Sequence, residues 1–505
     1  MNNGNKHLHP LMLAGTGSDV GKSILATAFC RIFKQDGYHP APFKAQNMAL
    51  NSYAPPEGLE IGRAQAVQAE AAGIDCHTDM NPVLLKPQSD HTSQLVLEGR
   101  PAGNYAASEY FRGERKKRLW PRVTAAYDRL AARYNPIVLE GAGSIAEINL
   151  RDNDFVNLPM ARYANARVFL VADIDRGGVF ASLYGTLMLL RPEERKLVRG
   201  LIVNKFRGDS GLFRPGVKML EDLCKVPVIG VIPYMPDVYI EEEDSVSLQS
   251  KSLQAQGGKI NIAVVLLRHI SNFTDFGLLE HDPRVHLYYT NNVNELTKAD
   301  IIILPGSKST LSDLYELRRN GVAEAVVKAH RDRRATVLGI CGGYQLMGQE
   351  VADPTHAEGD IERLPGLGLL PVSTTIGQEK TTRQVRFSLC AAHTAAPPSL
   401  MEGYEIHMGA TEPAQGAPSS PLNRFDDGRT EGYYVNSRCM GTYIHGILDN
   451  PGFVDFLLAP WLEQKDHAPR LDYKAFKEEQ YDKLAAHVRS CVDMPLIYQI
   501  LTCND

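Results

Sequence analysis

The chain has 505 residues, of which 44% are hydrophobic and 22% charged, and its formal net charge is -5. This composition is typical of a soluble globular protein, and the length predicts about three domains. The negative charge argues against a nucleic-acid-binding protein, because neutralising phosphates requires a basic surface. We expect no membrane partner, since no secretory signal is recognisable and no stretch approaches the roughly 20 apolar residues of a membrane helix. The 8 cysteines include no CxxC pair, which favours a cytoplasmic protein over a disulfide framework or a zinc site.

The first half of the chain alternates short apolar runs with helical patterns, from Leu11 to about Tyr234. Continuous Val, Ile and Leu runs of this length are typical of parallel strands that are covered on both faces. We therefore predict an α/β fold with a doubly wound, mostly parallel sheet. The runs span residues 11–15, 136–143, 168–173, 200–205 and 226–233.

The first run leads directly into the segment TGSDVGKS, which has the features of a phosphate-binding loop. Small residues allow backbone N–H groups to face an anion, and a helix that begins there directs its positive end toward phosphates. Lys22 and Ser23 supply the cation for the β/γ-phosphates and the hydroxyl for magnesium. The usual motif has a glycine where this chain has Thr16, so the loop carries one additional residue. A partition-type ATPase loop would have lysine at Gly17, which disfavours that alternative. We predict an ATP site formed by Thr16, Gly17, Ser18, Asp19, Val20, Gly21, Lys22 and Ser23.

Two further residues follow predicted strands of the same sheet. Glu140 ends the predicted strand within the run 136–143, and the glycines after it leave space for a ligand. Because magnesium prefers one or two carboxylates together with phosphate oxygens, Glu140 and Ser23 are the predicted metal ligands. A structural salt bridge is the alternative role for Glu140. Asn204 begins an Asn-Lys pair of the kind that reads a nucleobase, and we assign it to the ATP site.

A second α/β series begins at Ile260 and ends near Asn450. The segment before it is acidic and then rich in Ser, Gln and Gly, which is typical of a linker. The sequence after about Pro451 is polar and helical in pattern. We therefore divide the chain into residues 1–240, a linker 241–258, a second doubly wound domain 259–453 and a C-terminal helical extension 454–505.

Cys341 lies between a predicted strand and a predicted helix in ATVLGICGGYQLMG. A tight turn of this kind exposes the side chain and places the positive end of the helix beneath it, which lowers the pKa of a thiol. Backbone N–H groups at Gly342 and at the turn Gly306–Ser307 are the expected oxyanion donors. His445 in TYIHG is the expected base. The alternative is an inert buried cysteine and a structural histidine.

The motifs GICGGYQ and YIHG resemble the class I glutamine amidotransferases, whose domain has a flavodoxin-like fold. The resemblance implies that Cys341 attacks the glutamine amide, that His445 transfers protons and that Gln345 contributes to the glutamine site. Most members have a glutamate two positions after the histidine, where this chain has Ile447, as in the cobyric-acid type. The sequence therefore does not identify the carboxylate that orients His445, and Glu405 is one possibility.

The longer phosphate loop resembles that of dethiobiotin synthetase-like ligases, in which this spacing is usual. Five further motifs resemble the cobyric acid synthase family, so that the resemblance covers nearly everything from Met12 to about Asn450. It implies that residues 1–240 are an ATP-binding amidoligase domain and residues 259–453 a glutamine amidotransferase domain. A proline is expected at Ile145 in this family. The motifs are FKAQNMALNS, EIGRAQAVQAEAAG, MNPVLLKP, EGAGSIAEINL and ISNFTDFG.

This family resemblance implies amidation of four peripheral carboxylates (b, d, e and g) of adenosylcobyrinic acid a,c-diamide. ATP and Mg²⁺ would convert each carboxylate to an acyl phosphate, and ammonia would arrive from the Cys341 site through the protein. Asn47 and Asp154 are expected near the acyl phosphate. The partners are a corrinoid and L-glutamine, and cobalt enters within the corrinoid instead of being held by the protein.

Three rival functions remain at this point. Cobyrinic acid a,c-diamide synthase has the same two domains, but FKAQNMALNS favours the later enzyme. A nucleotide-switch protein with a degenerate glutaminase domain is a second rival, against which the intact Cys341 and His445 argue. The third is a corrinoid carrier that binds without turnover.

Overall fold

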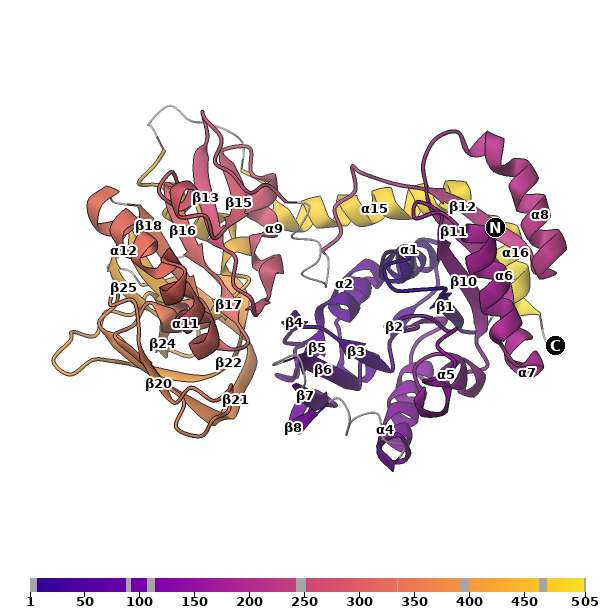
Figure 1. The fold of residues 1–505 in the computed structure, drawn as a ribbon, viewed down its shortest axis with the longest axis horizontal. Coiled ribbons are helices and arrows are strands. Elements are labelled where there is room, and N and C mark those ends of the chain that lie inside the picture. Colours follow the sequence, from indigo (N-terminus) through magenta and orange to yellow (C-terminus); the bar gives the residue numbers. More distant parts are fainter. Residues whose placement is uncertain are drawn as a thin grey trace.

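The computed structural model describes residues 7–87, 92–106, 114–241, 251–333, 335–390, 399–462 and 470–503. Figure 1 shows two α/β halves that are connected by the long helix α15 (Tyr473–Cys491). None of the helices in these ranges combines the length and the apolar character needed to cross a membrane.

The first half is built on a six-stranded sheet in the order β12-β11-β10-β1-β9-β2, with all neighbouring strands parallel. Successive residues of a strand point to opposite faces, and β1 accordingly contributes to two cores. Leu11 and Leu13 pack with Phe29 on one face, while Met12 and Ala14 belong to the core on the other. The predicted doubly wound parallel sheet is confirmed. Its strands are β1 (Leu11–Gly15), β2 (Ala41–Phe43), β9 (Ile137–Glu140), β10 (Arg167–Asp173), β11 (Val198–Phe206) and β12 (Val228–Pro233).

Helices cover both faces of this sheet. Their bounds are α1 (Lys22–Gln35), α2 (Arg63–Ala72), α4 (Glu114–Ala131), α5 (Leu158–Tyr163), α6 (Val179–Leu189), α7 (Pro192–Arg195) and α8 (Arg214–Cys224).

A small second sheet of the first half, in the order β3-β6-β7-β8, was not predicted from the sequence. It lies on the side that faces the second half of the molecule (Figure 1). A short antiparallel pair, β4 with β5, lies beside it. The strands are β3 (Gln46–Met48), β4 (Ser52–Tyr53), β5 (Ile61–Gly62), β6 (Val83–Pro87), β7 (Thr92–Leu97) and β8 (Arg100–Ala106).

The second half contains another predominantly parallel sheet, in the order β15-β13-β16-β18-β26-β25, in which only the β25–β26 pair is antiparallel. This confirms the second α/β sheet. The strands are β13 (Ile260–Val265), β15 (Val285–Thr290), β16 (Ile301–Leu304), β18 (Thr336–Ile340), β25 (Tyr433–Asn436) and β26 (Cys439–Thr442). The helices are α9 (Gly277–His281), α10 (Val293–Leu296), α11 (Thr310–Arg319), α12 (Val322–Arg333), α13 (Gly342–Leu346) and α14 (Pro451–Leu458).

Two smaller groups of strands complete the second half. A mainly antiparallel sheet is dominated by a long hairpin of β21 and β22, and β14 pairs with β17. The strands are β14 (Ile270–Ser271), β17 (Gly306–Ser307), β19 (Glu350–Ala352), β20 (Arg363–Pro365), β21 (Val372–Leu389), β22 (Met401–Pro413), β23 (Asn423–Phe425), β24 (Thr430–Glu431) and β27 (Ile444–His445).

The C-terminal helices α15 and α16 (Met494–Thr502) pack against the first half of the chain. Leu484, Val488 and Ile497 join the core formed by α1 and one face of the first sheet. Arg31 of α1 also pairs with Asp482 of α15 at 2.7 Å. The chain therefore returns to its first domain after completing the second.

Candidate active sites

The segment between β1 and α1 forms a loop around a large cavity. Gly21 adopts φ +95°, and a Cβ added there would lie 2.1 Å from Asn204 Nδ2, so this position requires glycine. The Asn204 amide donates to Val20 O at 2.9 Å and so holds the loop against β11. The Thr16 N–H donates to Val171 O at 3.0 Å. This N–H group is therefore used within the sheet and is not free to bind a ligand.

Lys22 turns back over this loop. Its Nζ donates to Gly17 O and Gly143 O, both at 2.9 Å. Burial lowers the pKa of Lys22 to about 8, although nearby Glu140 opposes that shift. Among the described residues this buried ammonium donates only to carbonyl oxygens, and it is therefore well prepared to bind a phosphate.

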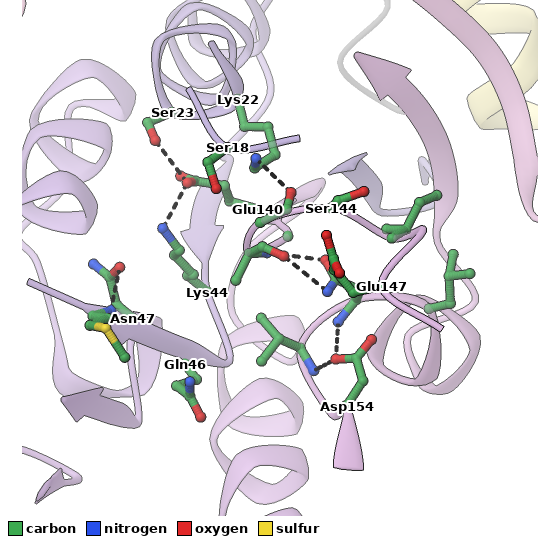
Figure 2. A pocket seen from close by; sticks show the side chains of 18 of the residues that line it. Ser18, Lys22, Ser23, Lys44, Gln46, Asn47, Glu140, Ser144, Glu147 and Asp154 are labelled. Atoms are coloured by element: carbon green, nitrogen blue, oxygen red, sulfur yellow. Dashed lines mark hydrogen bonds and ion pairs between the residues drawn. The ribbon is translucent and has the colours of Figure 1, made fainter. Parts of the chain in front are cut away.

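Glu140 is the centre of a buried polar cluster. Its Oε1 accepts hydrogen bonds from Ser23 Oγ and Lys44 Nζ, each at 2.8 Å, and its Oε2 accepts one from Gln68 Nε2 at 2.7 Å. Burial alone would raise the pKa of Glu140, but Lys44 and these hydrogen bonds hold it below its usual value. Figure 2 shows Ser23 and Lys44 converging on this carboxylate.

Ser23 and Glu140 fit the requirements of a magnesium ion that is bound together with a nucleotide. They place a hydroxyl and a carboxylate oxygen 2.8 Å apart beside the loop, and Mg²⁺ usually takes few protein ligands while phosphates and water complete its shell. Among the described residues no group of three or more His, Cys, Asp and Glu side chains is suited to hold a metal by itself.

The cavity beside the loop measures about 1200 Å³, which exceeds the 300–1,000 Å³ of ordinary ligand pockets. Asn47 and Asp154 both line it, and their expected place near an acyl phosphate stays a prediction. Asn47 Nδ2 donates to Gln65 Oε1 at 3.0 Å, and Asp154 Oδ1 accepts from the N–H groups of Val156 and Asn157. Asp154 lies across the cavity from Glu140 in Figure 2. The predicted loop residues that line the cavity are Ser18, Asp19, Gly21, Lys22 and Ser23.

A second cavity of about 290 Å³ adjoins the same loop at Gly21. Asn204 and Pro233 line one side of it, and Leu484 of α15 lines another. The second half of the molecule reaches it through Phe273. Its position beside the phosphate loop, together with an amide and apolar walls, suits a nucleobase.

In the second half, Cys341 occupies the turn between β18 and α13. Its φ of 52° is unusual for a residue with a side chain and marks a constrained turn. Helix α13 can pack closely against the end of β16 because it begins with glycines. A Cβ at Gly343 would lie 1.8 Å from Leu304 O. The thiol Sγ lies 3.5 Å from Ile406 O.

His445 lies in the same pocket as Cys341 and is completely buried beside Asp275. Its Nδ1 is 2.7 Å from Asp275 Oδ2, and the Gly446 N–H donates to Asp275 Oδ1 at 2.9 Å. Burial lowers the pKa of His445, but Asp275 and the Cys341 thiol outweigh it and raise the pKa to about 10. Asp275 therefore fixes the tautomer and orientation of the imidazole. Glu405, the possibility considered from the sequence, instead pairs with Arg383.

The predicted oxyanion residues lie close to one another. A Cβ at Gly342 would be 2.7 Å from Ser307 N, so two backbone segments meet next to the thiol. Ser307 Oγ donates to Asp313 Oδ2 at 2.6 Å, which fixes this turn. Gln345 also lines the pocket, but its amide is bonded to Thr310 Oγ1 and Tyr443 OH at 3.0 and 3.2 Å.

Two domain models match almost the whole chain. Residues 11–248 match the CobQ/CobB/MinD/ParA nucleotide binding domain, and residues 261–453 match the CobB/CobQ-like glutamine amidotransferase domain. A cobyric acid synthase of Bacteroides fragilis is 72% identical and aligns over 99% of this chain and 100% of its own. The chain belongs to the cobyric acid synthase family. It is an ATP-dependent, glutamine-hydrolysing ligase, as the motifs predicted.

A further relative agrees with this membership. The cobyric acid synthase of Parabacteroides distasonis is 58% identical over 98% of this chain and 99% of its own. Among solved structures, PurLQS from Thermotoga maritima shares 14% identity, covers 44% of this chain and 99% of that chain, and gives a TM-score of 0.29.

Several residues of the two candidate sites were missed by the analysis of the sequence alone. Lys44 lies within FKAQNMALNS and Asp275 within ISNFTDFG, two motifs that indicated the cobyric acid synthase family. Their position in these motifs was therefore the one sequence feature that could have marked Lys44 and Asp275 as site residues. Lys86, which lines the Cys341 pocket from the first domain, lies in a third such motif, MNPVLLKP.

Proposed function

We propose that this member of the cobyric acid synthase family amidates the b, d, e and g carboxylates of adenosylcobyrinic acid a,c-diamide. The observation that carries the proposal is the presence in one chain of a thiol–imidazole–carboxylate pocket and a lysine-lined phosphate loop with a buried carboxylate. The large cavity beside the loop supports a bulky acid as second substrate. The relatives named cobyric acid synthase support the same assignment.

The chemistry follows from the two sites. A carboxylate is a poor acyl donor, so ATP converts it to an acyl phosphate in the large cavity. Lys22 and the loop N–H groups stabilise charge on the transferring phosphoryl group. Ser23 and Glu140 would hold magnesium together with the nucleotide, and the ion would supply positive charge there. Asn47 and Asp154 are the proposed residues near the acyl phosphate, and Asn204 is the proposed base-reading residue.

The second site supplies the nitrogen. Cys341 attacks the side-chain amide of glutamine, and the N–H groups near Gly306, Ser307 and Gly342 stabilise the oxyanion. His445 takes the thiol proton and then delivers it to the departing ammonia. Water hydrolyses the glutamyl thioester and regenerates the thiol. The free ammonia attacks the acyl phosphate and displaces phosphate.

We assign the reaction to the cytoplasm. All 8 cysteines are free, which suits a reducing compartment. Cobalt enters with the corrinoid. The main alternative function is cobyrinic acid a,c-diamide synthase, which acts one step earlier on related carboxylates.

Mass spectrometry of the corrinoid tests the proposed function. Purified protein, ATP, Mg²⁺ and glutamine are incubated with adenosylcobyrinic acid a,c-diamide, and each amidation exchanges one carboxyl oxygen for nitrogen. We expect four successive amidations of this substrate. Amidation of unmodified cobyrinic acid at the a and c positions would instead support the alternative, and binding without turnover would indicate a carrier.

Replacing Asp275 with asparagine tests the proposed histidine arrangement. We expect glutamine hydrolysis to fall about 10²-fold, which is typical when general acid–base catalysis is impaired. The pKa of His445 should fall once Asp275 is neutral, so the imidazolium stabilises the thiolate less. The limb of the kcat/KM profile for glutamine that reports the protonation of His445 should therefore move to lower pH. The measurement is the pH profile of glutamine hydrolysis.

Glu405→Gln is the comparison variant for Asp275→Asn. Because Glu405 pairs with Arg383 and does not contact His445 among the described interactions, the limb that reports His445 should stay in place in the Glu405→Gln enzyme. A larger shift with Glu405→Gln than with Asp275→Asn would contradict the assignment of Asp275.

A further inference from the structure

The Cys341 pocket is lined by an unusual number of charged side chains from both domains. Its cavity is about 40 Å³, and three lysines and one glutamate line it near the thiol. Lys308, Glu358 and Lys380 come from the glutaminase domain, while Lys86 comes from β6 of the ligase domain. Such groups are almost never buried unless they are paired, so the partners of each indicate what the pocket binds.

Two of the lysines are already neutralised by a carboxylate of the ligase domain. Lys86 Nζ donates to Glu60 Oε1 at 2.7 Å and to Ser52 Oγ at 2.9 Å, and Lys380 pairs with Glu60 Oε2. Glu60 is completely buried. Burial would raise its pKa, but Lys380 and Lys86 lower it well below the usual value. This triad joins the two domains at the edge of the pocket.

Lys308 lacks such a partner. It is only 8% exposed, and its Nζ donates to the neutral Gln94 Oε1 of the ligase domain at 3.1 Å. Within the described ranges no carboxylate lies within 4.0 Å of its ammonium. Burial, together with Lys380 and Lys86, lowers the pKa of Lys308 to about 7. An anion placed against Lys308 would therefore be strongly favoured.

Glu358, in turn, is a carboxylate without a close cation among the described residues. Its Oε2 accepts a hydrogen bond from Thr310 N at 2.8 Å, and no cation lies within 4.0 Å of its carboxylate in the described part of the chain. Burial raises its pKa, although Lys308 opposes that shift. Lys308 and Glu358 thus place one cation and one anion, each without an ion-pair partner within 4.0 Å among the described residues, in the same pocket as the Cys341 thiol.

We infer that Lys308 and Glu358 bind the zwitterionic head of glutamine, with Lys308 on the α-carboxylate and Glu358 on the α-ammonium. The side-chain amide then extends toward Cys341, which lines the same cavity. This inference rests on the proposed glutaminase role of Cys341 and adds its substrate-recognising residues.

The geometry also links glutamine binding to the domain interface. A cavity of about 40 Å³ holds only a few water molecules, so glutamine must displace side chains from it. Lys308 exchanges its bond to Gln94, a residue of the ligase domain, for the charge-assisted bond to the substrate carboxylate. Binding of glutamine would therefore break the hydrogen bond between Lys308 and Gln94 that joins the two domains.

Glutamine hydrolysis by the full-length protein tests this inference with substrates that lack one head group at a time. 4-Aminobutanamide lacks the α-carboxylate, and glutaramic acid lacks the α-ammonium. For Lys308→Met we expect KM for glutamine to rise about 10- to 100-fold, the usual effect of losing a hydrogen bond to a charged group. Its kcat at saturating glutamine should change little, and 4-aminobutanamide should be hydrolysed as well as by the unmodified enzyme.

Glu358→Gln should give the mirror pattern. KM for glutamine should rise similarly, while glutaramic acid, which lacks the ammonium, should show no further loss. Lys328→Met and Glu324→Gln on the exposed face of α12 are matched controls, and neither should change any of these values. Lys308→Gln, which retains a donor to Gln94, replaces Lys308→Met where the latter does not fold.

An equal loss on glutamine and on both shortened analogues would overturn the inference, because it would assign Lys308 and Glu358 to domain packing alone. Unchanged kinetics in both variants would overturn it as well. The assay requires no corrinoid, so this pattern can appear even where corrinoid amidation fails. A failure of the proposed overall reaction is therefore distinguishable from a failure of the glutamine site.

Discussion

Cys341→Ala is expected to abolish amidation with glutamine and to preserve amidation with a high concentration of an ammonium salt. In the proposed mechanism the thiol is the nucleophile that releases nitrogen, whereas the acyl phosphate forms in the separate cavity beside Lys22 and Glu140. Loss of a catalytic nucleophile should lower the glutamine-dependent rate by at least about 10³-fold. Corrinoid product formed with each nitrogen source is measured by chromatography and mass spectrometry.

The control for this substitution is Cys503→Ala, which removes an exposed thiol near the end of the chain. It should leave both nitrogen sources usable. If Cys341→Ala removed the ammonium-dependent activity too, with the protein folded, the division of nitrogen release and carboxylate activation between two sites would be wrong.

Lys22→Ala is expected to remove amidation with both nitrogen sources, while glutamine hydrolysis partly survives. Lys22 is held over the phosphate loop by Gly17 O and Gly143 O, where its ammonium would face the transferring phosphoryl group. Removal of one preorganised electrostatic group at a transition state usually lowers kcat about 10²- to 10³-fold. The measurements are corrinoid amidation, ATP hydrolysis and glutamate release on the same preparation.

Lys34→Ala is the matched control for Lys22→Ala, because Lys34 lies in the last turn of the same helix α1. It should leave amidation unchanged. An equal loss of amidation and glutamine hydrolysis in Lys22→Ala would show that the glutaminase depends on an intact ATP site, and the assumption of separable half-reactions would then be wrong.

Much of the fold could be predicted because parallel strands are buried on both faces. Continuous apolar runs such as 11–15 and 168–173 therefore marked β1 and β10 directly. The small sheet of β3, β6, β7 and β8 escaped prediction because its strands are short and, apart from the largely buried β6, only partly buried. In β8 (Arg100–Ala106) no residue is fully buried, so no continuous apolar run marks the strand.

The residues of the candidate sites also differ in whether a local sequence pattern marks them. Residues next to a glycine-rich turn, such as Lys22 and Cys341, were predictable because the turn itself carries the chemistry. Asp275 was not, because it meets His445 from a position 170 residues away in the chain. Lys86, Lys308 and Glu358 were missed for the same reason, since single charged residues show no local pattern that distinguishes burial from exposure.

The sequence by itself determined the two α/β sheets, the phosphate loop and the cysteine turn, because each depends on neighbours along the chain: apolar continuity, small residues and a helix start. Only the tertiary structure decided which carboxylate holds His445, which lysines lie near Glu140 and around the Cys341 pocket, and that α15 returns to pack on α1. These are contacts between distant segments. They are selected by the burial of charge and of apolar surface in the assembled molecule, and no local pattern in the sequence indicates which distant residues will pair.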